Sequence, residues 1–255
     1  MSVFILVHGA WHGSWCWKHV RQHLRDLGHE VFTPTLTGLG ERSHLLDLSI
    51  SVETHIDDIA NLMIWEELED VVLVAHSYGG FVARHVTDRL PQRIRQLVYV
   101  DAFVPDDGRS LVDYAPTFAQ MFRDGARDQG DGWKVPPVPS HIFAVNSKDA
   151  AWVDRQCTPH PLTTFETPAR LGTHGNAVPA AYILAGEFPG SPFPRFAAAA
   201  REQGWACHTL PDGHDLMLDC PADLAALLHR LGGGQGPSEG QASEMSPPQT
   251  SGLPG

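Results

Sequence analysis

One serine in this 255-residue chain lies in a pattern that can perform nucleophilic chemistry. Residues 71–80 read Val-Val-Leu-Val-Ala-His-Ser-Tyr-Gly-Gly, so an apolar run leads to Ser77 and two glycines follow it. The apolar run predicts a buried strand and residues 81–90 predict a helix, with a tight turn that needs small residues at Ala75 and Gly79. Such a turn holds the hydroxyl of Ser77 above the sheet, ready to attack a substrate. The alternative is that this serine only caps the helix.

A glycine-containing loop near the N-terminus can supply backbone N–H donors for that chemistry. A strand expected over residues 3–7 leads directly into His8-Gly9-Ala10-Trp11. When a serine attacks a carbonyl group, one donor to the developing oxyanion comes from the residue after the nucleophile and another from an early loop. We therefore expect the backbone N–H groups of Tyr78 and Ala10 to form an oxyanion hole. The alternative for this loop is a tight turn with a structural glycine.

A histidine near the C-terminus is the candidate general base. The segment Asp212-Gly213-His214-Asp215 follows a strand expected over residues 205–210 and precedes a helix that opens at Pro221. A loop after the last strand can carry His214 over the sheet edge to the nucleophile. The two flanking carboxylates, Asp212 and Asp215, are expected to cap the loop or to face solvent.

Two carboxylates compete for the role of the acid that orients this histidine. Asp101 directly ends a strand expected over residues 96–100, and Glu187 follows a strand expected over residues 180–185. Ligand and catalytic groups collect at the carboxyl ends of strands in open α/β sheets. We favour Asp101, because a carboxylate that ends a strand is held more firmly than one in a loop. The alternative for Asp101 is that it only caps a turn.

These stretches together resemble the α/β-hydrolase superfamily, and more narrowly its small-esterase and hydroxynitrile-lyase branch. The resemblance spans roughly residues 1–231 and implies a mostly parallel sheet of about six strands, flanked by helices, with an inserted cap. It also implies a catalytic triad, for which Ser77, His214 and the favoured acid Asp101 are the candidates. The matching motifs are His8-Gly9-Ala10-Trp11-His12-Gly13-Ser14-Trp15, Thr35-Leu36-Thr37-Gly38-Leu39-Gly40, Ala75-His76-Ser77-Tyr78-Gly79-Gly80, Asp101-Ala102-Phe103-Val104-Pro105 and Gly213-His214-Asp215.

The chain departs from this branch at three positions. Its plant members place an aspartate after the next-to-last strand, where this chain has Glu187 or Phe188, whereas the dehalogenase lineage places the acid where Asp101 falls. Its lyases carry threonine at the position of Gly9 and lysine at that of Asp215. An anion at the latter position would repel departing cyanide, so hydrolysis is favoured over cyanohydrin cleavage.

The expected function is therefore that of a serine carboxylesterase-type hydrolase acting through an acyl-enzyme, with no metal and no organic cofactor. Trp11, Tyr78 and aromatic residues of the cap suggest a small apolar or aromatic substrate that is an ester, a carbamate or an amide. Two alternatives stay open: a hydroxynitrile lyase acting on cyanohydrins, and a ligand receptor built on a hydrolase fold.

Alternating strands and helices divide the chain into three parts. Residues 1–104 and 179–231 are expected to form the α/β core, residues 105–178 a cap or lid, and residues 232–255 a disordered tail rich in Gly, Ser and Pro. The expected strands are 3–7, 30–33, 71–74, 96–100, 180–185 and 205–210, and the expected helices 15–27, 52–67, 81–90 and one from 221. Candidate pocket residues in the cap are Phe118, Met121, Phe122, Trp133, Phe143, Trp152 and Phe165.

Composition restricts the partners and the compartment. The formal net charge of −12 argues against nucleic acids and anionic membranes as partners. No apolar run could span a bilayer and no signal peptide is evident, while four scattered cysteines indicate a reducing compartment, so a cytoplasmic location is expected. His8 and His12 are expected to stabilise their loop rather than to bind zinc, because no nearby carboxylate or cysteine suits a metal. A homodimer is left open.

Overall fold

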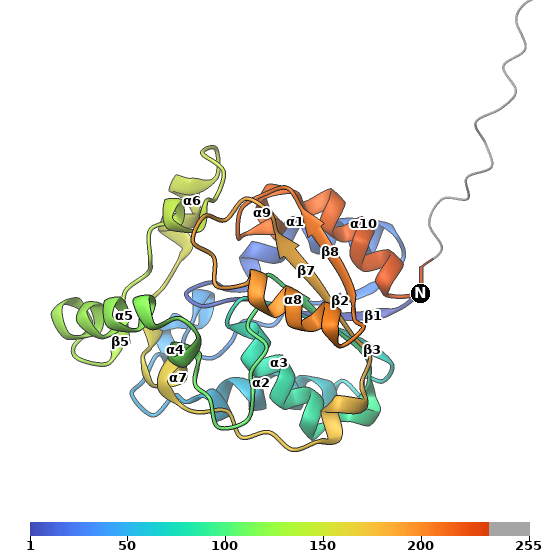
Figure 1. Cartoon of the computed structure of the whole chain (residues 1–255), viewed down its shortest axis with the longest axis horizontal. Helices are drawn as coiled ribbons and strands as arrows, with labels where there is room; N and C mark the ends of the chain where they lie inside the picture. The colour runs from blue at the N-terminus through green and yellow to red at the C-terminus, as the bar shows by residue number, and fades with distance from the viewer. Residues whose placement is uncertain (235–255) are drawn as a thin grey trace, which may run out of the picture.

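Six strands form one parallel sheet in the computed structural model, which describes residues 1–234 (Figure 1). Their order across the sheet is β2-β1-β3-β4-β7-β8, which confirms the expected α/β architecture. Residues 235–255, most of the expected tail, lie outside the described part. The strands are β1 Val3–Val7, β2 Glu30–Phe32, β3 Val71–His76, β4 Ile94–Val100, β7 Ala180–Ala185 and β8 Ala206–Leu210.

The strand order places the candidate site at the carboxyl ends of the central strands. From β1 the chain moves outward to β2 and then crosses back to β3, so the order reverses between β1 and β3. In open parallel sheets, ligands bind in the crevice outside the carboxyl ends of the strands at such a reversal. Val7 pairs with Ala75 at these ends, so the loop after β1 lies beside the turn that holds Ser77.

Helices cover both faces of the sheet, and Figure 1 shows α1 and α10 on one side and α2, α3 and α8 on the other. Side chains of β1 alternate between the two layers: Ile5 and Val7 pack with α2, α3 and α8, while Phe4 and Leu6 pack with α1 and α10. This alternation is the period of two that a strand buried on both faces requires. The bounds are α1 Lys18–Asp26, α2 Val52–Trp65, α3 Gly79–Arg89, α8 Pro194–Glu202, α9 Leu216–Asp219 and α10 Pro221–Leu231.

The segment between β4 and β7 adds no strand to the main sheet. It contains the α-helices α4 to α7 and a two-stranded antiparallel sheet, and Figure 1 shows α5 and α6 extending from one end of the main sheet. The elements are α4 Leu111–Tyr114, α5 Pro116–Gln129, β5 Lys134–Val135, α6 Ala150–Gln156, β6 His160–Pro161 and α7 Thr163–Glu166. Turns of 3₁₀-helix are η1 Ser14–Trp17, η2 Gly40–Leu45, η3 Pro91–Arg93, η4 Ser140–Phe143 and η5 His174–Ala177.

Several element boundaries differ from the expected ones by one or two residues, and two of the differences have clear local reasons. The helix expected over 15–27 divides into η1 and α1, because the backbone of Trp17 has ψ near 1°, outside the α-helical range. The helix after the serine starts at Gly79 rather than at residue 81, so both glycines of the turn are helical. A β-carbon on Gly79 would lie 2.8 Å from the carbonyl oxygen of His8, and one on Gly80 would collide with that of Phe103. Only glycine lets this helix start so close to its neighbours.

Among residues 1–234, no helix has the length and apolar character needed to cross a bilayer.

Candidate active site

Ser77 occupies a strained turn between β3 and α3. Its backbone φ is 53°, in the left-handed region that costs a non-glycine residue roughly 1–2 kcal/mol. Hydrogen bonds hold the turn on both sides: Ser77 N donates to Val100 O at 3.4 Å, and Phe103 N donates to Ser77 O at 3.2 Å. The half-buried side chain lines an apolar cavity. A strained serine at the end of a strand is the geometry that presents a hydroxyl to a substrate.

Asp101 is the carboxylate that contacts the candidate base. It follows β4, is fully buried, and accepts a hydrogen bond from His214 Nδ1 at 2.6 Å. Its other carboxylate oxygen accepts from Ala185 N at 3.1 Å, so both oxygens are held. Burial raises the pKa of Asp101, against the lowering effect of the hydrogen bond and charge of His214. Glu187, the competing candidate, is exposed.

His214 lies in an aromatic environment beside the cavity. It is 3% exposed, and the ring of Phe193 stacks on it with centroids 5.0 Å apart. Phe188 and Phe143 contact the other parts of the ring, and the backbone N–H of His214 donates to Phe143 O at 3.0 Å. A proton on Nδ1 directed at Asp101 leaves Nε2 as the acceptor of the neutral ring.

Ser77 and His214 line the same cavity, although within residues 1–234 no hydrogen bond joins the Ser77 hydroxyl to the His214 ring. Catalytic hydrogen bonds are often long before substrate binds and tighten only in the complex. The structure therefore brings Ser77, His214 and Asp101 to one place, with the histidine and the aspartate in direct contact.

The loop after β1 also faces this cavity. Ala10 and Tyr78, the expected oxyanion donors, both line it and are buried. A β-carbon on Gly9 would lie 2.9 Å from the β-carbon of Ser77, closer than real β-carbons approach. The threonine that the resembling lyases carry at position 9 would therefore not fit this backbone.

Trp11 ties this loop to the segment between β4 and β7. Its φ is 62°, and its backbone N–H donates to His160 Nδ1 at 3.3 Å. Its carbonyl accepts from Thr158 N at 2.9 Å, and its indole N–H donates to Val135 O at 3.2 Å. Trp11 lines the cavity, as a substrate-binding residue would, and also joins the two parts of the chain.

The cavity is apolar and strongly aromatic. Four of the expected aromatic residues line it, Phe118, Phe122, Phe143 and Phe165, whereas Met121, Trp133 and Trp152 do not. Six lining residues were missed by the sequence analysis: Phe103, Leu111, Ala115, Phe188, Pro192 and Phe193. Among the described residues, none of the lining side chains belongs to Asp, Glu, Lys or Arg. The closely spaced Phe188-Pro189 and Phe193-Pro194 after β7 were a signal that could have found two of the missed residues.

The expectation that Asp215 caps its loop or faces solvent is wrong. Asp215 is fully buried, and its carboxylate lies 3.1 Å from Nε2 of His12, a residue 203 positions earlier. The view that no carboxylate lies near this histidine was therefore also wrong, because the chain folds back on itself here. His8 and His12 do stabilise their loop, since they donate from Nδ1 to the carbonyl oxygens of Gly9 at 2.8 Å and Ala10 at 2.7 Å. Asp212 is half-buried.

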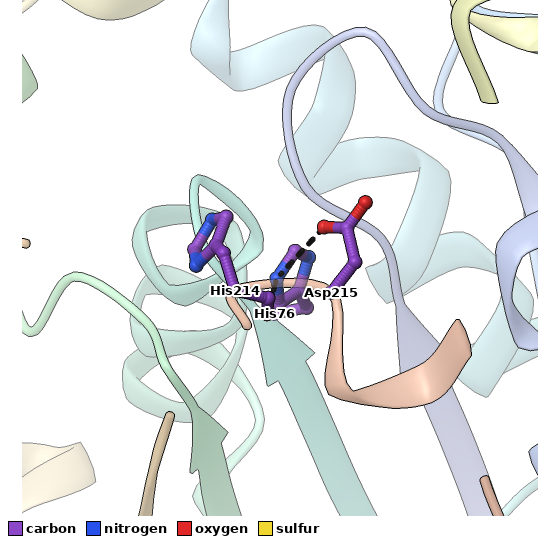
Figure 2. Close-up of side chains that lie close together, drawn as sticks. All are labelled: His76, His214 and Asp215. Atoms are coloured by element: carbon purple, nitrogen blue, oxygen red, sulfur yellow. Dashed lines mark hydrogen bonds and ion pairs between the residues drawn. The ribbon is translucent and has the colours of Figure 1, made fainter. Parts of the chain in front are cut away.

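Three buried side chains come nearest to a set of metal ligands. His76, His214 and Asp215 offer atoms within 4.8 Å of one another, and Figure 2 shows them gathered beside the end of β3. Several of their polar atoms already have protein partners: His76 Nε2 donates to His214 O at 3.1 Å, His214 Nδ1 donates to Asp101, and Asp215 Oδ2 accepts from His12. Among the described residues, His76 Nδ1 and Asp215 Oδ1 have no hydrogen-bond partner. The arrangement is that of a hydrogen-bond network, and we assign no metal to it.

Comparison with known proteins identifies what this chain resembles. The profile of the alpha/beta hydrolase family matches residues 4–227. The carbendazim hydrolyzing esterase of Nocardioides sp. (strain SG-4G) is 44% identical over 243 residues, covering 91% of this chain and 100% of that protein. Methyl jasmonate esterase 1 of Vitis vinifera is 39% identical over 171 residues, covering 66% of this chain and 65% of that protein.

A solved structure shares the fold along almost the whole chain. An extracellular alpha/beta-hydrolase from a Paenibacillus species superposes with a TM-score of 0.79 at 24% identity, covering 90% of this chain and 98% of the other. The match supports the sheet order and the helical layers described above.

Buried neutral histidines near the site make stability sensitive to acid. Burial lowers the pKa of His8 to about 3 and that of His55 to about 4, and it places those of His76 and His160 well below 6.5. Below about pH 6.5 the unfolded chain therefore binds more protons than the folded chain, and stability falls as pH falls. The raised pKa of His12 favours the folded state at low pH, but this single group opposes the four histidines whose pKa values are lowered.

We expect the melting temperature to be lower by about 5 °C or more at about pH 5 than at about pH 7.5. Replacing the buried His55 with glutamine should make this dependence shallower, whereas His19→Gln, at an exposed position, should leave it unchanged. Thermal unfolding followed by circular dichroism measures the effect. Equal melting temperatures at the two pH values would contradict it.

Proposed function

Because the chain belongs to the alpha/beta hydrolase family, we propose that it is a serine esterase that cleaves esters or carbamates of small, uncharged aromatic or apolar compounds. One observation carries the proposal. His214, whose Nδ1 lies 2.6 Å from Oδ2 of the buried Asp101, lines the same apolar cavity as a strained serine. The esterases among its relatives support ester hydrolysis as the reaction.

In the proposed mechanism, Nε2 of His214 accepts the proton of the Ser77 hydroxyl while the serine oxygen attacks the carbonyl carbon of the substrate. Asp101 holds the histidine tautomer and stabilises the imidazolium that forms. The imidazolium then gives its proton to the departing alcohol, which leaves an acyl-enzyme on Ser77. His214 then takes a proton from water, which attacks the acyl carbon. The bond from that carbon to Ser77 Oγ breaks, the imidazolium returns the proton to Oγ, and the acid leaves.

The oxyanion of each tetrahedral intermediate accepts hydrogen bonds from the backbone N–H groups of Ala10 and Tyr78. Support for this assignment comes from their position in the cavity lining beside Ser77. Tyr78 also lies at the N-terminus of α3, where the helix dipole favours negative charge. In a site without water, such donors stabilise a developing charge far more than they would in solution.

Residues 105–178 act as a cap in this proposal. They supply six of the fifteen residues that line the cavity, including Phe118, Phe122, Phe143 and Phe165. Anchored through Trp11, the cap would exclude water from the reacting carbonyl and bind the apolar part of the substrate.

The first prediction concerns the nucleophile. Replacing Ser77 with alanine should lower kcat for a simple aryl ester by about 10⁶-fold, because the members of a triad act as a unit. The same change should abolish covalent labelling by a fluorophosphonate. Ser43→Ala, at an exposed serine, is the matched control and should keep both activity and labelling. A Ser77 variant that still hydrolyses the ester at near the original rate would refute covalent catalysis by this residue.

The second prediction concerns the acid. Asp101→Asn should lower kcat on the order of 10⁴-fold with little change in KM, because an amide no longer stabilises the correct histidine tautomer. Glu187→Gln is the matched control, since it removes a carboxylate that is exposed, and should leave kcat unchanged. Steady-state kinetics measure kcat and KM of both variants, with the concentration of active sites determined by fluorophosphonate labelling of the folded protein. A severe loss in the Glu187 variant instead would transfer the role to that residue.

The third prediction concerns substrate charge. A carboxylate in this cavity would lose its hydration without gaining a cationic partner, which is costly. We therefore expect kcat/KM for 4-acetoxybenzoate to be lower by about 10²-fold or more than that for 4-methylphenyl acetate, a neutral ester of similar shape. Equal values would show that the substrate binds elsewhere.

Carbendazim and mandelonitrile should be assayed beside these two esters. Release of cyanide from mandelonitrile without ester hydrolysis would favour a lyase, and a single round of labelling without turnover of any ester would favour a receptor.

A further inference from the structure

We propose that His12 and Asp215 are positioning residues, a buried ion pair that joins the loop after β1 to the loop after β8. The pair would hold the oxyanion donor Ala10 and the base His214 in fixed relation to each other. This inference rests on the proposed function, because positioning has a kinetic effect only if these groups react.

Hydrogen bonding requires the His12 ring to be a cation. Its Nδ1 lies 2.7 Å from the carbonyl oxygen of Ala10, and its Nε2 lies 3.1 Å from Oδ2 of Asp215. A carbonyl oxygen and an ionised carboxylate only accept hydrogen bonds, so both ring nitrogens must carry protons. Burial alone would lower the pKa of His12, but the charge and hydrogen bond of Asp215 raise it above its usual value. The pKa of Asp215 is correspondingly lowered, despite its burial.

The pair is removed from solvent. His12 is 3% exposed and Asp215 is fully buried, and the indole of Trp15 stacks on the His12 ring with centroids 4.9 Å apart. Removing one partner from a buried pair leaves an uncompensated charge, so the arrangement is far more sensitive to a single substitution than a surface pair would be.

On one side, the pair fixes the backbone around Ala10. The His12 ring holds the carbonyl of Ala10, and His8 Nδ1 holds the carbonyl of Gly9 at 2.8 Å. The C=O of Gly9 and the N–H of Ala10 belong to one planar trans peptide and point in opposite directions. With both neighbouring peptide planes held by histidines, the direction of the Ala10 N–H is set before substrate arrives.

On the other side, the pair fixes the base loop. Asp215 is the residue after His214, and its carbonyl accepts from Leu218 N at 2.7 Å at the start of α9. Its second carboxylate oxygen lies 3.7 Å from Nε2 of His76, which donates to the carbonyl of His214 at 3.1 Å (Figure 2). His76 directly precedes Ser77, so the loops that carry donor, nucleophile and base all meet at Asp215.

The protonation of this pair responds to every titratable group that faces it. Around His12 these are His8, His76 and Asp215. Around Asp215 they are His12, His76, His214, Asp101, Asp219, Cys16 and Cys157. The buried neutral imidazoles of His8 and His76 leave His12 as the cation that compensates this carboxylate.

The first test reads the protonation of His12 directly and needs no substrate. In protein with ¹⁵N-labelled histidine, both ring nitrogens of His12 should still be protonated at about pH 7, above the ordinary histidine pKa of about 6.5. The His12→Gln spectrum assigns the signal. A neutral His12 ring at that pH would overturn the proposal, whether or not the protein hydrolyses esters.

The second test separates positioning from folding. Asp215→Asn should lower kcat per fluorophosphonate-titrated site by about 10- to 100-fold while KM changes less than about threefold, because misplaced groups slow the chemical step. Asp212→Asn on the same loop, and His19→Gln at an exposed site, are the matched controls and should leave kcat unchanged. Unchanged kcat in a folded Asp215→Asn variant would overturn the proposal.

The third test asks whether the two residues act together. The double variant His12→Asn/Asp215→Asn should lose no more kcat than the worse of the two single variants, since it removes the uncompensated charge and keeps an N–H near Ala10. Multiplying losses would overturn the pairing. Failure of the unmodified protein to hydrolyse esters or take up the label would count against the proposed function instead, and the protonation test would still decide the pair.

Discussion

Two left-handed residues at the ends of adjacent strands are the constraint on which the rest of the site depends. Ser77 ends β3 with φ 53° and Asp101 ends β4 with φ 40°, and neither is glycine. Each such conformation costs of order 1–3 kcal/mol and persists only where its surroundings impose it. Here the sheet imposes it, because Ser77 N donates to Val100 O and Asp101 N donates to Ile183 O. Beyond these turns, Asp101 contacts His214, and Ser77 lines the cavity that His214 also lines.

The surroundings of these residues determine how strongly their charges act. Aromatic rings enclose His214, and the cavity lining of the described chain has no Asp, Glu, Lys or Arg side chain. In such an environment the effective dielectric constant is low, so a few placed dipoles and one carboxylate have large effects. Behind the cavity, the His12–Asp215 pair puts two opposite charges where burial of one alone would be prohibitive. The site is therefore apolar toward the substrate and polar toward the protein.

The segment between β4 and β7 helps the core to hold the groups of the site in place. Through Trp11 it accepts or donates three hydrogen bonds to the loop that carries Ala10, and through Phe143 it contacts the base. A change in this segment would consequently act on the position of the donor as well as on the shape of the cavity. Substrate selection and catalysis would then be linked by shared side chains.

The amino-acid sequence by itself determined the sheet, most of its strands and the identity of the candidate nucleophile, because these depend on local patterns. Buried β-branched runs specify parallel strands, and small residues around Ser77 specify the tight turn. The same local reasoning located His214 after the last strand. The roles of these residues stay predictions, although their positions around one cavity are those that the mechanism needs.

Only the tertiary structure decided which carboxylates meet which histidines. Asp101 and His214 are 113 positions apart, and His12 and Asp215 are 203 apart. The local pattern favoured Asp101 over Glu187, but only the folded chain shows that Asp101 is buried against His214 while Glu187 is exposed. The same limit explains why Asp215 was expected in solvent and why Phe188 and Phe193 were missed as cavity residues. Burial and charge pairing are properties of the folded chain, since they depend on which distant segments the strand order brings together.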